Sequence, residues 1–177
     1  SITKISKKNV IFHLGEHMEE DFKNADLIIR NPGVPDDSPF LAIARKKKIP
    51  IHNEASLFFD IVKRPIIGVT GTRGKSTTSS IIYELLRQKY PNTIIAGNRG
   101  DVAMFSLVEE ATRKTKDPII LELSSWQVEG LAVVSKSPHV AVLTNLFPDH
   151  LNRYKDIDSY YKAKRFLFAF QNKNDIA

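Results

Sequence analysis

The sequence predicts an α/β fold built on a parallel sheet. Short apolar runs alternate with longer amphipathic runs, which is the pattern of repeated strand–helix units. Several of the short runs are apolar throughout, as expected for strands that are buried on both faces of a sheet. The chain has 177 residues, of which 42% are hydrophobic and 26% are charged, so it can form a sizeable core. At roughly 150 residues per domain, this length predicts one domain, or one domain and part of another.

Seven apolar runs are predicted to form strands, and each is bounded by residues typical of turns. They are Val10–Leu14, Leu27–Ile29, Ile49–His52, Pro65–Thr70, Thr93–Ala96, Pro118–Leu123 and His139–Asn145. The last residues of the chain, Asp175–Ala177, resemble the start of a further strand.

The predicted helices begin at residues that commonly cap a helix. Ser38 followed by Pro39 opens a helix over Phe40–Lys47, and Asn53 opens one over Glu54–Val62. Three further helices are predicted at Gly74–Gln88, at Val102–Glu110 with Asp101 as its cap, and from Asp158 or Ser159 to about Phe170.

A domain boundary is predicted near Lys63–Pro65, because no chemical motif precedes it and several follow it. This boundary gives an N-terminal part, residues 1–63, and a second part, residues 64–177. The chain starts inside an α/β unit and stops as another strand begins, so we expect it to be a fragment of a longer protein.

Composition excludes several classes of protein. The chain has no cysteine, which excludes disulfides, thiolate metal sites and cysteine nucleophiles and favours a cytoplasmic location. No apolar run has the length of a membrane span, and the first residues do not form a signal peptide. The net charge of +6 suits an anionic partner, such as a nucleotide, a nucleic acid or a membrane surface.

The segment Ile66–Thr78 has the context of a phosphate-binding loop. An apolar strand leads into a glycine-rich turn, then Gly-Lys-Ser, then a helix. Backbone N–H groups and the helix N-terminus would bind phosphate, Lys75 would neutralise it, and Ser76 would bind Mg²⁺. The general motif has glycine where this chain has Val69. The candidate phosphate-binding residues are Gly71, Thr72, Arg73, Gly74, Lys75, Ser76 and Thr77.

Two more predicted strands carry polar residues at their carboxyl ends, where ligands bind in open α/β sheets. Glu122 ends one of them and is a candidate Mg²⁺ ligand. The other leads to Asn145, Asp149 and His150, and a neutral imidazole can bind a metal ion. In the last helix, hydrophobic periodicity does not distinguish Lys164 from a lysine on a solvated face.

Together these segments resemble the Mur ligase family, ATP-dependent amino-acid ligases of bacterial peptidoglycan synthesis. The resemblance extends over nearly the whole chain. The segments that carry it are Asn31–Pro35, Gly71–Thr77, Ala96–Gly100, Leu121–Gln127 and Asp149–Tyr154.

Within this family, Leu121–Gln127 resembles the branch that adds D-glutamate to UDP-N-acetylmuramoyl-L-alanine. Three positions depart from that branch's pattern: Trp126 stands for a usual phenylalanine, Arg99 is unusual in its loop, and Pro148 replaces a common glutamate. The resemblance implies that the alanine carboxylate attacks the γ-phosphate of ATP. The acyl phosphate formed in this way is then attacked by the amine of D-glutamate.

The resemblance also implies roles for individual residues. Lys75 holds the ATP phosphates, and Ser76 and Glu122 bind Mg²⁺. His150 and Lys164, the latter carbamylated by CO₂, bind a second Mg²⁺. Lys75, His150 and Lys164 would thus be the catalytic residues. The predicted substrate-binding residues are Gly33, Asn98 and Ser124.

The family has three domains, and the resemblance assigns residues 1–63 to part of a Rossmann-like, UDP-binding N-terminal domain. Residues 64–177 correspond to part of the P-loop-type central domain, and the C-terminal domain is missing. We therefore expect the fragment to be inactive alone. The parent is expected to be a monomeric cytoplasmic enzyme that binds neither nucleic acid nor membrane.

Two alternatives remain open at this point. One is another P-loop ATPase or a Mur-type ligase for a different amino acid. The other is a non-enzymatic basic module that binds nucleic acid through Lys46–Lys48 and the basic last helix.

Overall fold

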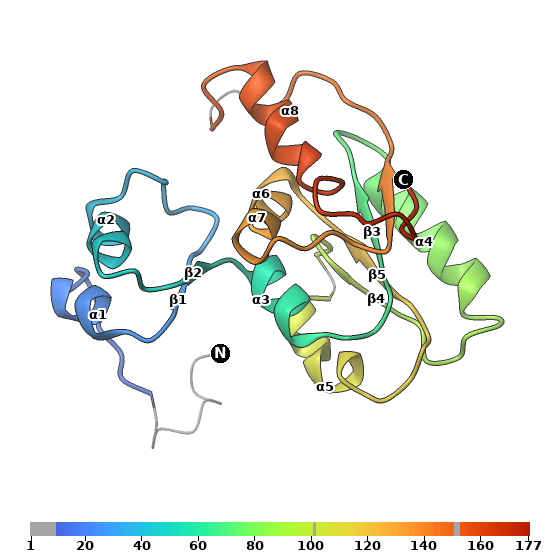
Figure 1. Ribbon diagram of the computed structural model, residues 1–177, viewed down its shortest axis with the longest axis horizontal. Coiled ribbons are helices and arrows are strands. Elements are labelled where there is room, and N and C mark those ends of the chain that lie inside the picture. The colour runs from blue at the N-terminus through green and yellow to red at the C-terminus, as the bar shows by residue number, and fades with distance from the viewer. Residues whose placement is uncertain (1–9, 101, 151–152) are drawn as a thin grey trace. The chain divides into compact units, whose positions relative to one another are not determined.

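The computed structural model describes residues 10–100, 102–150 and 153–177 (Figure 1). The chain forms two compact units, residues 1–51 and residues 52–177. The candidate phosphate-binding residues lie in the second unit.

The first unit pairs two short strands and two helices. Strand β1 (Ile28–Ile29) pairs with β2 (Ile51–His52), and α1 (Glu19–Asn24) packs against α2 (Pro39–Lys46). Helix α2 starts after Ser38 with proline at its first turn, as predicted. The predicted strand at Val10–Leu14 is wrong: these residues are exposed and form no strand, because none of the strands in the described residues pairs with them. Helix α1 was not predicted.

The second unit is built on a four-stranded parallel sheet, which confirms the predicted α/β fold class. The strand order is β4-β5-β3-β6. The strands are β3 (Ile66–Thr70), β4 (Ile94–Gly97), β5 (Ile119–Glu122) and β6 (Val140–Leu143). All four fall within or beside predicted runs. Strand β5 lies between β4 and β3, and every one of its residues is buried, as its unbroken apolar run predicts.

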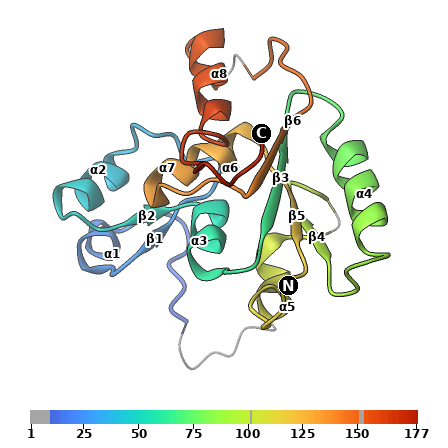
Figure 2. The same ribbon diagram turned by 45° about the vertical axis from the view of Figure 1, so that its right-hand side comes forward.

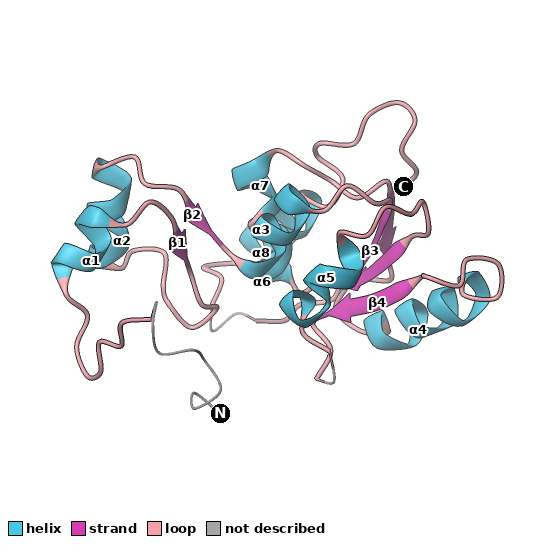
Figure 3. Cartoon of the chain, turned by 90° about the horizontal axis from the view of Figure 1, so that it is seen from below, coloured by secondary structure: helices cyan, strands magenta, loops and turns pink. Residues whose placement is uncertain are grey.

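Helices cover the two faces of this sheet unequally. Helix α4 (Lys75–Leu86) lies on one side, and α3 (Glu54–Ile61), α6 (Ser125–Glu129) and α7 (Leu131–Val134) lie on the other (Figures 2 and 3). Helix α8 (Ile157–Arg165) packs on α6. The predicted helix at Val102–Glu110 is instead a 3₁₀ turn, η2 (Met104–Leu107), followed by α5 (Val108–Ala111). Its predicted cap, Asp101, lies outside the described residues.

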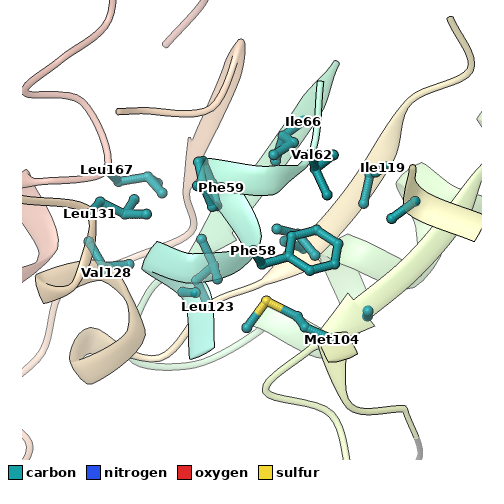
Figure 4. Close-up of a cluster of buried hydrophobic side chains, with 14 of the residues drawn as sticks. Phe58, Phe59, Val62, Ile66, Met104, Ile119, Leu123, Val128, Leu131 and Leu167 are labelled. Carbon is teal, nitrogen blue, oxygen red and sulfur yellow. The ribbon is translucent and has the colours of Figure 1, made fainter. Parts of the chain in front are cut away.

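The main core fills the space between the sheet and the helices that include α3 (Figure 4). Phe58 and Met104 are fully buried there, in one cluster with Ile119 and Leu131. Asn53 caps α3 as predicted: its side chain accepts from Ser56 N at 2.8 Å, and the Ser56 hydroxyl accepts from Asn53 N at 3.0 Å.

Arg64 joins the segments that lead into three strands. Its side chain is 4% exposed, and its guanidinium donates to the backbone carbonyls of Glu110, Asn92 and Asp117 at 2.8, 2.6 and 2.9 Å. A single arginine fork therefore satisfies three carbonyls at the amino end of the sheet.

The C-terminal residues approach the free edge of β6. Ile176 forms a parallel bridge with Val140, through Ala141 N to Ile176 O at 2.8 Å and Ile176 N to His139 O at 2.8 Å. The resemblance of Asp175–Ala177 to a strand start is consistent with this bridge.

Within the described residues, no helix is long and apolar enough to span a bilayer.

Candidate functional site

The candidate site lies at the carboxyl edge of the parallel sheet. Val69 of β3 is in register with Glu122 of β5, which is in register with Gly97 of β4. Thr70 at the end of β3 is in register with Leu143 of β6. The register therefore brings the ends of all four strands, and the residues that follow them, to one edge of the sheet.

The phosphate loop (Gly71–Thr77) connects the end of β3 to the first turn of α4. Gly74 is the N-cap residue of α4, and the first helical hydrogen bond runs from Thr78 N to Gly74 O at 3.0 Å. The N–H groups of residues 74–77 thus have no acceptor inside the helix, and the helix dipole adds positive potential where they point. This is an anion-binding geometry of the predicted kind.

Two residues that follow β6 hold the phosphate loop. Asn145 O accepts from Thr72 N at 3.1 Å, and Asn145 Oδ1 accepts from Arg73 N at 2.9 Å. Asn145 Nδ2 and Thr144 Oγ1 both donate to Arg73 O, at 3.0 and 2.6 Å. The N–H groups of Thr72 and Arg73 are therefore already hydrogen-bonded within the protein. As phosphate-binding residues, Gly71, Thr72 and Arg73 stay predictions.

The two catalytic lysine candidates meet at the phosphate loop. Lys75 Nζ folds back and donates to Gly71 O and Thr72 O, each at 3.0 Å. Lys164 Nζ comes from α8 and donates to Gly71 O at 3.1 Å and to Thr70 Oγ1 at 3.3 Å. Residues 75 and 164 are distant in sequence, yet their side chains share one carbonyl acceptor.

Lys164 is buried, with 3% of its surface exposed. Its pKa is lowered from 10.5 to about 8, chiefly by burial and also by the charge of Lys75, while Asp149 opposes the shift. Lys164 Nζ also lies 5.0 Å from the centroid of the Tyr160 ring. A lysine in this environment carries a usable fraction of neutral amine near physiological pH.

Glu122 ends β5 with a buried carboxylate. The residue is 2% exposed, and its Oε2 atom has no hydrogen-bond partner among the described residues. An unpartnered buried carboxylate oxygen is costly for a protein, and it is an oxygen ligand of the kind that divalent cations prefer.

His150 lies on the loop between β6 and α8 and is exposed. Its backbone is left-handed (φ 56°), and its ring centroid lies 5.9 Å from that of Tyr160. The Tyr160 hydroxyl is 3.1 Å from Thr72 Oγ1, and Phe147 N donates to the same Thr72 oxygen at 3.0 Å. Tyr160 therefore links α8, which carries Lys164, to the phosphate loop.

The predicted metal ligands do not form a dense cluster of acidic and imidazole groups. Within the described residues, no three or more His, Cys, Asp or Glu side chains are grouped so that they could hold an ion. Lys164 meets the phosphate loop directly, Glu122 reaches the same sheet edge through β5, and His150 is placed beside Tyr160.

The predicted substrate-binding residues have different surroundings. Asn98 is exposed, and its N–H donates to Glu122 O at 2.7 Å. Ser124 is the N-cap of α6, where its hydroxyl accepts from Gln127 N at 3.2 Å, and Gln127 Oε1 accepts from Ser124 N at 2.9 Å. Gly33 lies in the first unit, in a turn where its N–H donates to Asn31 Oδ1 at 3.0 Å.

Sequence reasoning missed Thr144 and Tyr160 as parts of this site. The signal for Thr144 is a polar residue directly after an apolar strand. The signal for Tyr160 is spacing. One side of the last helix and of the turn that follows it is buried, and it is made of residues at helical intervals: Tyr160, Ala163, Lys164 and Leu167. That stripe marks Lys164 as inward-facing.

The chain is similar to known proteins in sequence and in structure. The family model described as Mur ligase middle domain matches residues 69–177. The chain is 38% identical over 175 residues to UDP-N-acetylmuramoylalanine--D-glutamate ligase of Roseiflexus sp. (strain RS-1), covering 99% of this chain and 37% of that protein. It is 40% identical over 158 residues to the protein of the same name from Borreliella burgdorferi (strain ZS7), covering 89% of this chain and 33% of that one. The chain thus spans about a third of the relatives' length.

Solved structures show the same fold at low identity. The Neisseria meningitides UDP-N-acetylmuramate:L-alanyl-gamma-D-glutamyl-meso-diaminopimelate ligase superposes with a TM-score of 0.56 at 16% identity, covering 86% of this chain and 51% of that one. The Thermotoga maritima MurF ligase, in complex with ADP, gives a TM-score of 0.51 at 19% identity, covering 90% of this chain and 44% of that one.

Proposed function

The chain belongs to the Mur ligase family, through the family's middle domain, and from this membership we propose that it is the nucleotide-binding part of an ATP-dependent ligase. The ligase would add D-glutamate to UDP-N-acetylmuramoyl-L-alanine in peptidoglycan synthesis. The names of the curated relatives support this substrate pair. In this proposal, residues 1–63 belong to a UDP-binding N-terminal domain and residues 64–177 to the central ATP-binding domain.

One observation carries the proposal: the first turn of α4 offers free N–H groups at the carboxyl edge of a parallel sheet, with Lys75 beside them. An anion at this helix N-terminus would meet the N–H groups of residues 74–77 and the helix dipole. Lys75 is held by two carbonyls, and it would exchange them for phosphate oxygens when a nucleotide binds. The ADP bound to the Thermotoga maritima relative agrees with a nucleotide ligand.

Mg²⁺ is the metal ion that this reaction would use, and the residues present can hold it. Glu122 supplies a buried carboxylate oxygen that lacks a protein donor among the described residues, and Ser76 supplies a hydroxyl in the first turn of α4. A bound Mg²⁺ would neutralise phosphate charge that otherwise repels the attacking carboxylate.

Lys164 and His150 would serve a second cation. The lowered pKa of Lys164 makes its neutral amine available near pH 8. Attack of that amine nitrogen on the carbon of CO₂, with loss of one proton to solvent, would give a carbamate, which is an anionic oxygen ligand. This chemistry explains why a lysine is placed where a metal ligand is needed.

The chain's own residues would act by positioning and by charge. Lys75 would stabilise negative charge as the γ-phosphate moves to the alanine carboxylate, and α4 would orient the phosphates. Asn98, Ser124 and Gly33 are proposed contacts to the nucleotide sugar. We further propose that the parent acts as a cytoplasmic monomer, without a nucleic-acid or membrane partner.

The test is Mg²⁺-dependent ATP binding by calorimetry, with the wild-type chain, Lys75→Ala and Lys89→Ala compared. Lys89 is exposed and lies beyond the end of α4, so its removal matches the charge change without touching the phosphate loop. Wild type and Lys89→Ala should bind, and Lys75→Ala should bind at least about tenfold more weakly. A folded wild-type chain that binds no ATP, or Lys75→Ala that binds equally well, would contradict the proposal.

A further inference from the structure

Thr144 and Asn145 hold the backbone of two successive phosphate-loop residues, Thr72 and Arg73. The side-chain amide of Asn145 pairs with both backbone groups of Arg73: its Oδ1 accepts from Arg73 N at 2.9 Å, and its Nδ2 donates to Arg73 O at 3.0 Å. The Thr144 hydroxyl donates to the same Arg73 oxygen at 2.6 Å. Asn145 O also accepts from Thr72 N at 3.1 Å. We call Thr144 and Asn145, with these four hydrogen bonds, the β6 latch.

The β6 latch fixes the direction of a phosphate-binding group through the planarity of the peptide bond. Arg73 C=O and Gly74 N–H belong to one peptide, and in a trans peptide they point in opposite directions. No peptide bond in the described residues is cis. Two donors that hold Arg73 O on the side of β6 therefore aim Gly74 N–H away from β6. Gly74 N–H is the first of the free N–H groups at the start of α4.

Close packing supports the same assignment. Gly71 has a positive φ of 148°, and a Cβ atom built there would lie 1.9 Å from Thr144 Oγ1. The loop backbone therefore approaches the Thr144 side chain as closely as only glycine allows. The β6 latch and the glycine together leave the peptides at 71–73 little freedom to rotate.

We propose that Thr144 and Asn145 are positioning residues that hold the phosphate loop in its binding shape before the nucleotide arrives. This proposal rests on the proposed function, because it assumes that a phosphate binds at residues 74–77. A loop that is preorganised in this way loses less conformational entropy when it binds an anion.

The experiment compares Thr144→Val, Thr144→Ser and Asn145→Ala with the wild-type chain. Thr144→Val keeps the shape of the side chain and removes the hydroxyl donor, whereas Thr144→Ser keeps the donor. Calorimetry measures the affinity for Mg·ATP, and urea titration measures the free energy of unfolding. NMR measures the hydrogen exchange of the Thr72 and Arg73 amides. Exchange reports the β6 latch itself, and affinity reports its consequence for binding.

Thr144→Val and Asn145→Ala should each weaken Mg·ATP binding about five- to tenfold while the chain stays folded. Thr144→Ser should recover most of the affinity. The amide of Arg73 should be protected in the wild type and exchange faster in Asn145→Ala. A residue that only stabilised the fold would lower the free energy of unfolding and leave the affinity of the folded chain intact.

Three results would overturn the proposal, and they distinguish the positioning role from the proposed function. The positioning role alone would be overturned if Thr144→Val and Asn145→Ala bound Mg·ATP as tightly as the wild type. It would also be overturned if the Arg73 amide were unprotected in the wild type. A folded wild-type chain without affinity for Mg·ATP would overturn the proposed function, and the positioning role with it.

Discussion

Lys75 and Lys164 donate hydrogen bonds to the same acceptor, the carbonyl oxygen of Gly71, at 3.0 and 3.1 Å. Two ammonium groups that share one oxygen repel each other, and both gain when an anion arrives between them. The chain therefore holds positive charge at the start of α4 before any ligand binds. Conversion of Lys164 to an anion would turn this repulsion into attraction.

The lowered pKa of Lys164 predicts a pH dependence of stability. Its pKa is about 8 in the folded chain and near 10.5 when unfolded, so the unfolded state binds more protons between these values. Stability from this group should therefore rise from pH 8 toward 10.5, and it should be lost as the pH falls through 8. Between pH 8 and pH 10.5, the free energy of unfolding of the wild type should rise by up to about 3 kcal/mol relative to that of Lys164→Met. Urea titrations at pH 7.5, 8.5 and 9.5 measure this difference.

Lys162→Met is the matched control for this titration, because Lys162 is exposed on the same helix. Its free energy of unfolding relative to the wild type should stay flat over the same pH range. If the difference in free energy of unfolding between the wild type and Lys164→Met also did not change with pH, the predicted shift in the pKa of Lys164 would be wrong.

Carbamylation should be specific to Lys164. When the chain is equilibrated with ¹³C-labelled bicarbonate, one carbamate signal is expected by NMR, and it should grow as the pH is raised toward 8 because the neutral amine is the nucleophile. Lys164→Arg should abolish this signal and Lys162→Arg should retain it. A signal that survives in Lys164→Arg would assign the reactive amine elsewhere.

The sheet could be predicted because its strands carry their own signal. β3 and β5 are short apolar runs, as burial within a parallel sheet requires, and β6 is a short apolar run that is only partly buried. The strand at Val10–Leu14 was wrong for the same reason, since an apolar run shows hydrophobicity and does not show whether a partner strand is present. Helices α6 and α7 were missed because five and four residues are too few to display a helical period.

The phosphate loop and the presence of Glu122 and Asn145 at the carboxyl edge of the sheet could be predicted, whereas the contacts between these segments could not. The phosphate loop is contiguous, so glycine, lysine and serine at fixed spacing reveal it. The β6 latch depends on Asn145 meeting Arg73, 72 residues away in the sequence, and no local pattern encodes that approach. Lys164 was identified through the family resemblance, and the structure buries it on the same side of α8 as Tyr160.

Arg64 should be among the most sensitive positions for stability outside the candidate site. Arg64→Ala takes the guanidinium donor from the carbonyls of Asn92 and Asp117, and each unpaired carbonyl is costly when water cannot replace the donor. Glu110 O loses one donor and keeps Arg113 N at 3.2 Å. The free energy of unfolding of Arg64→Ala should be about 3 kcal/mol lower than that of the wild type. Arg64→Lys should recover only part of this loss, because one ammonium group does not reach all three carbonyls.

Arg87→Ala is the control for Arg64, because Arg87 is 53% exposed at its side chain and pairs with Glu84 on the surface. Arg87→Ala should lower the free energy of unfolding by less than about 0.5 kcal/mol. Equal losses for Arg64→Ala and Arg87→Ala in urea titrations would contradict the role assigned to the buried fork.

Gly97 is the position where the end of β4 meets the predicted metal ligand. It adopts φ +114°, and a Cβ atom there would lie 2.0 Å from the carbonyl oxygen of Glu122. That oxygen is backbone and also accepts from Asn98 N at 2.7 Å, so a rotamer change cannot relieve the clash. Gly97→Ala should lower the free energy of unfolding by about 2–4 kcal/mol.

Gly100→Ala separates this close approach from a general effect of replacing glycine. Nothing lies within 4 Å of a Cβ atom at Gly100, and its φ is outside the left-handed range. Its substitution should change the free energy of unfolding by less than about 1 kcal/mol in either direction. If Gly97→Ala proved as mild as Gly100→Ala in urea, the ends of β4 and β5 would have to lie farther apart than the register of Gly97 with Glu122 requires, and the placement of Glu122 at the site would need revision.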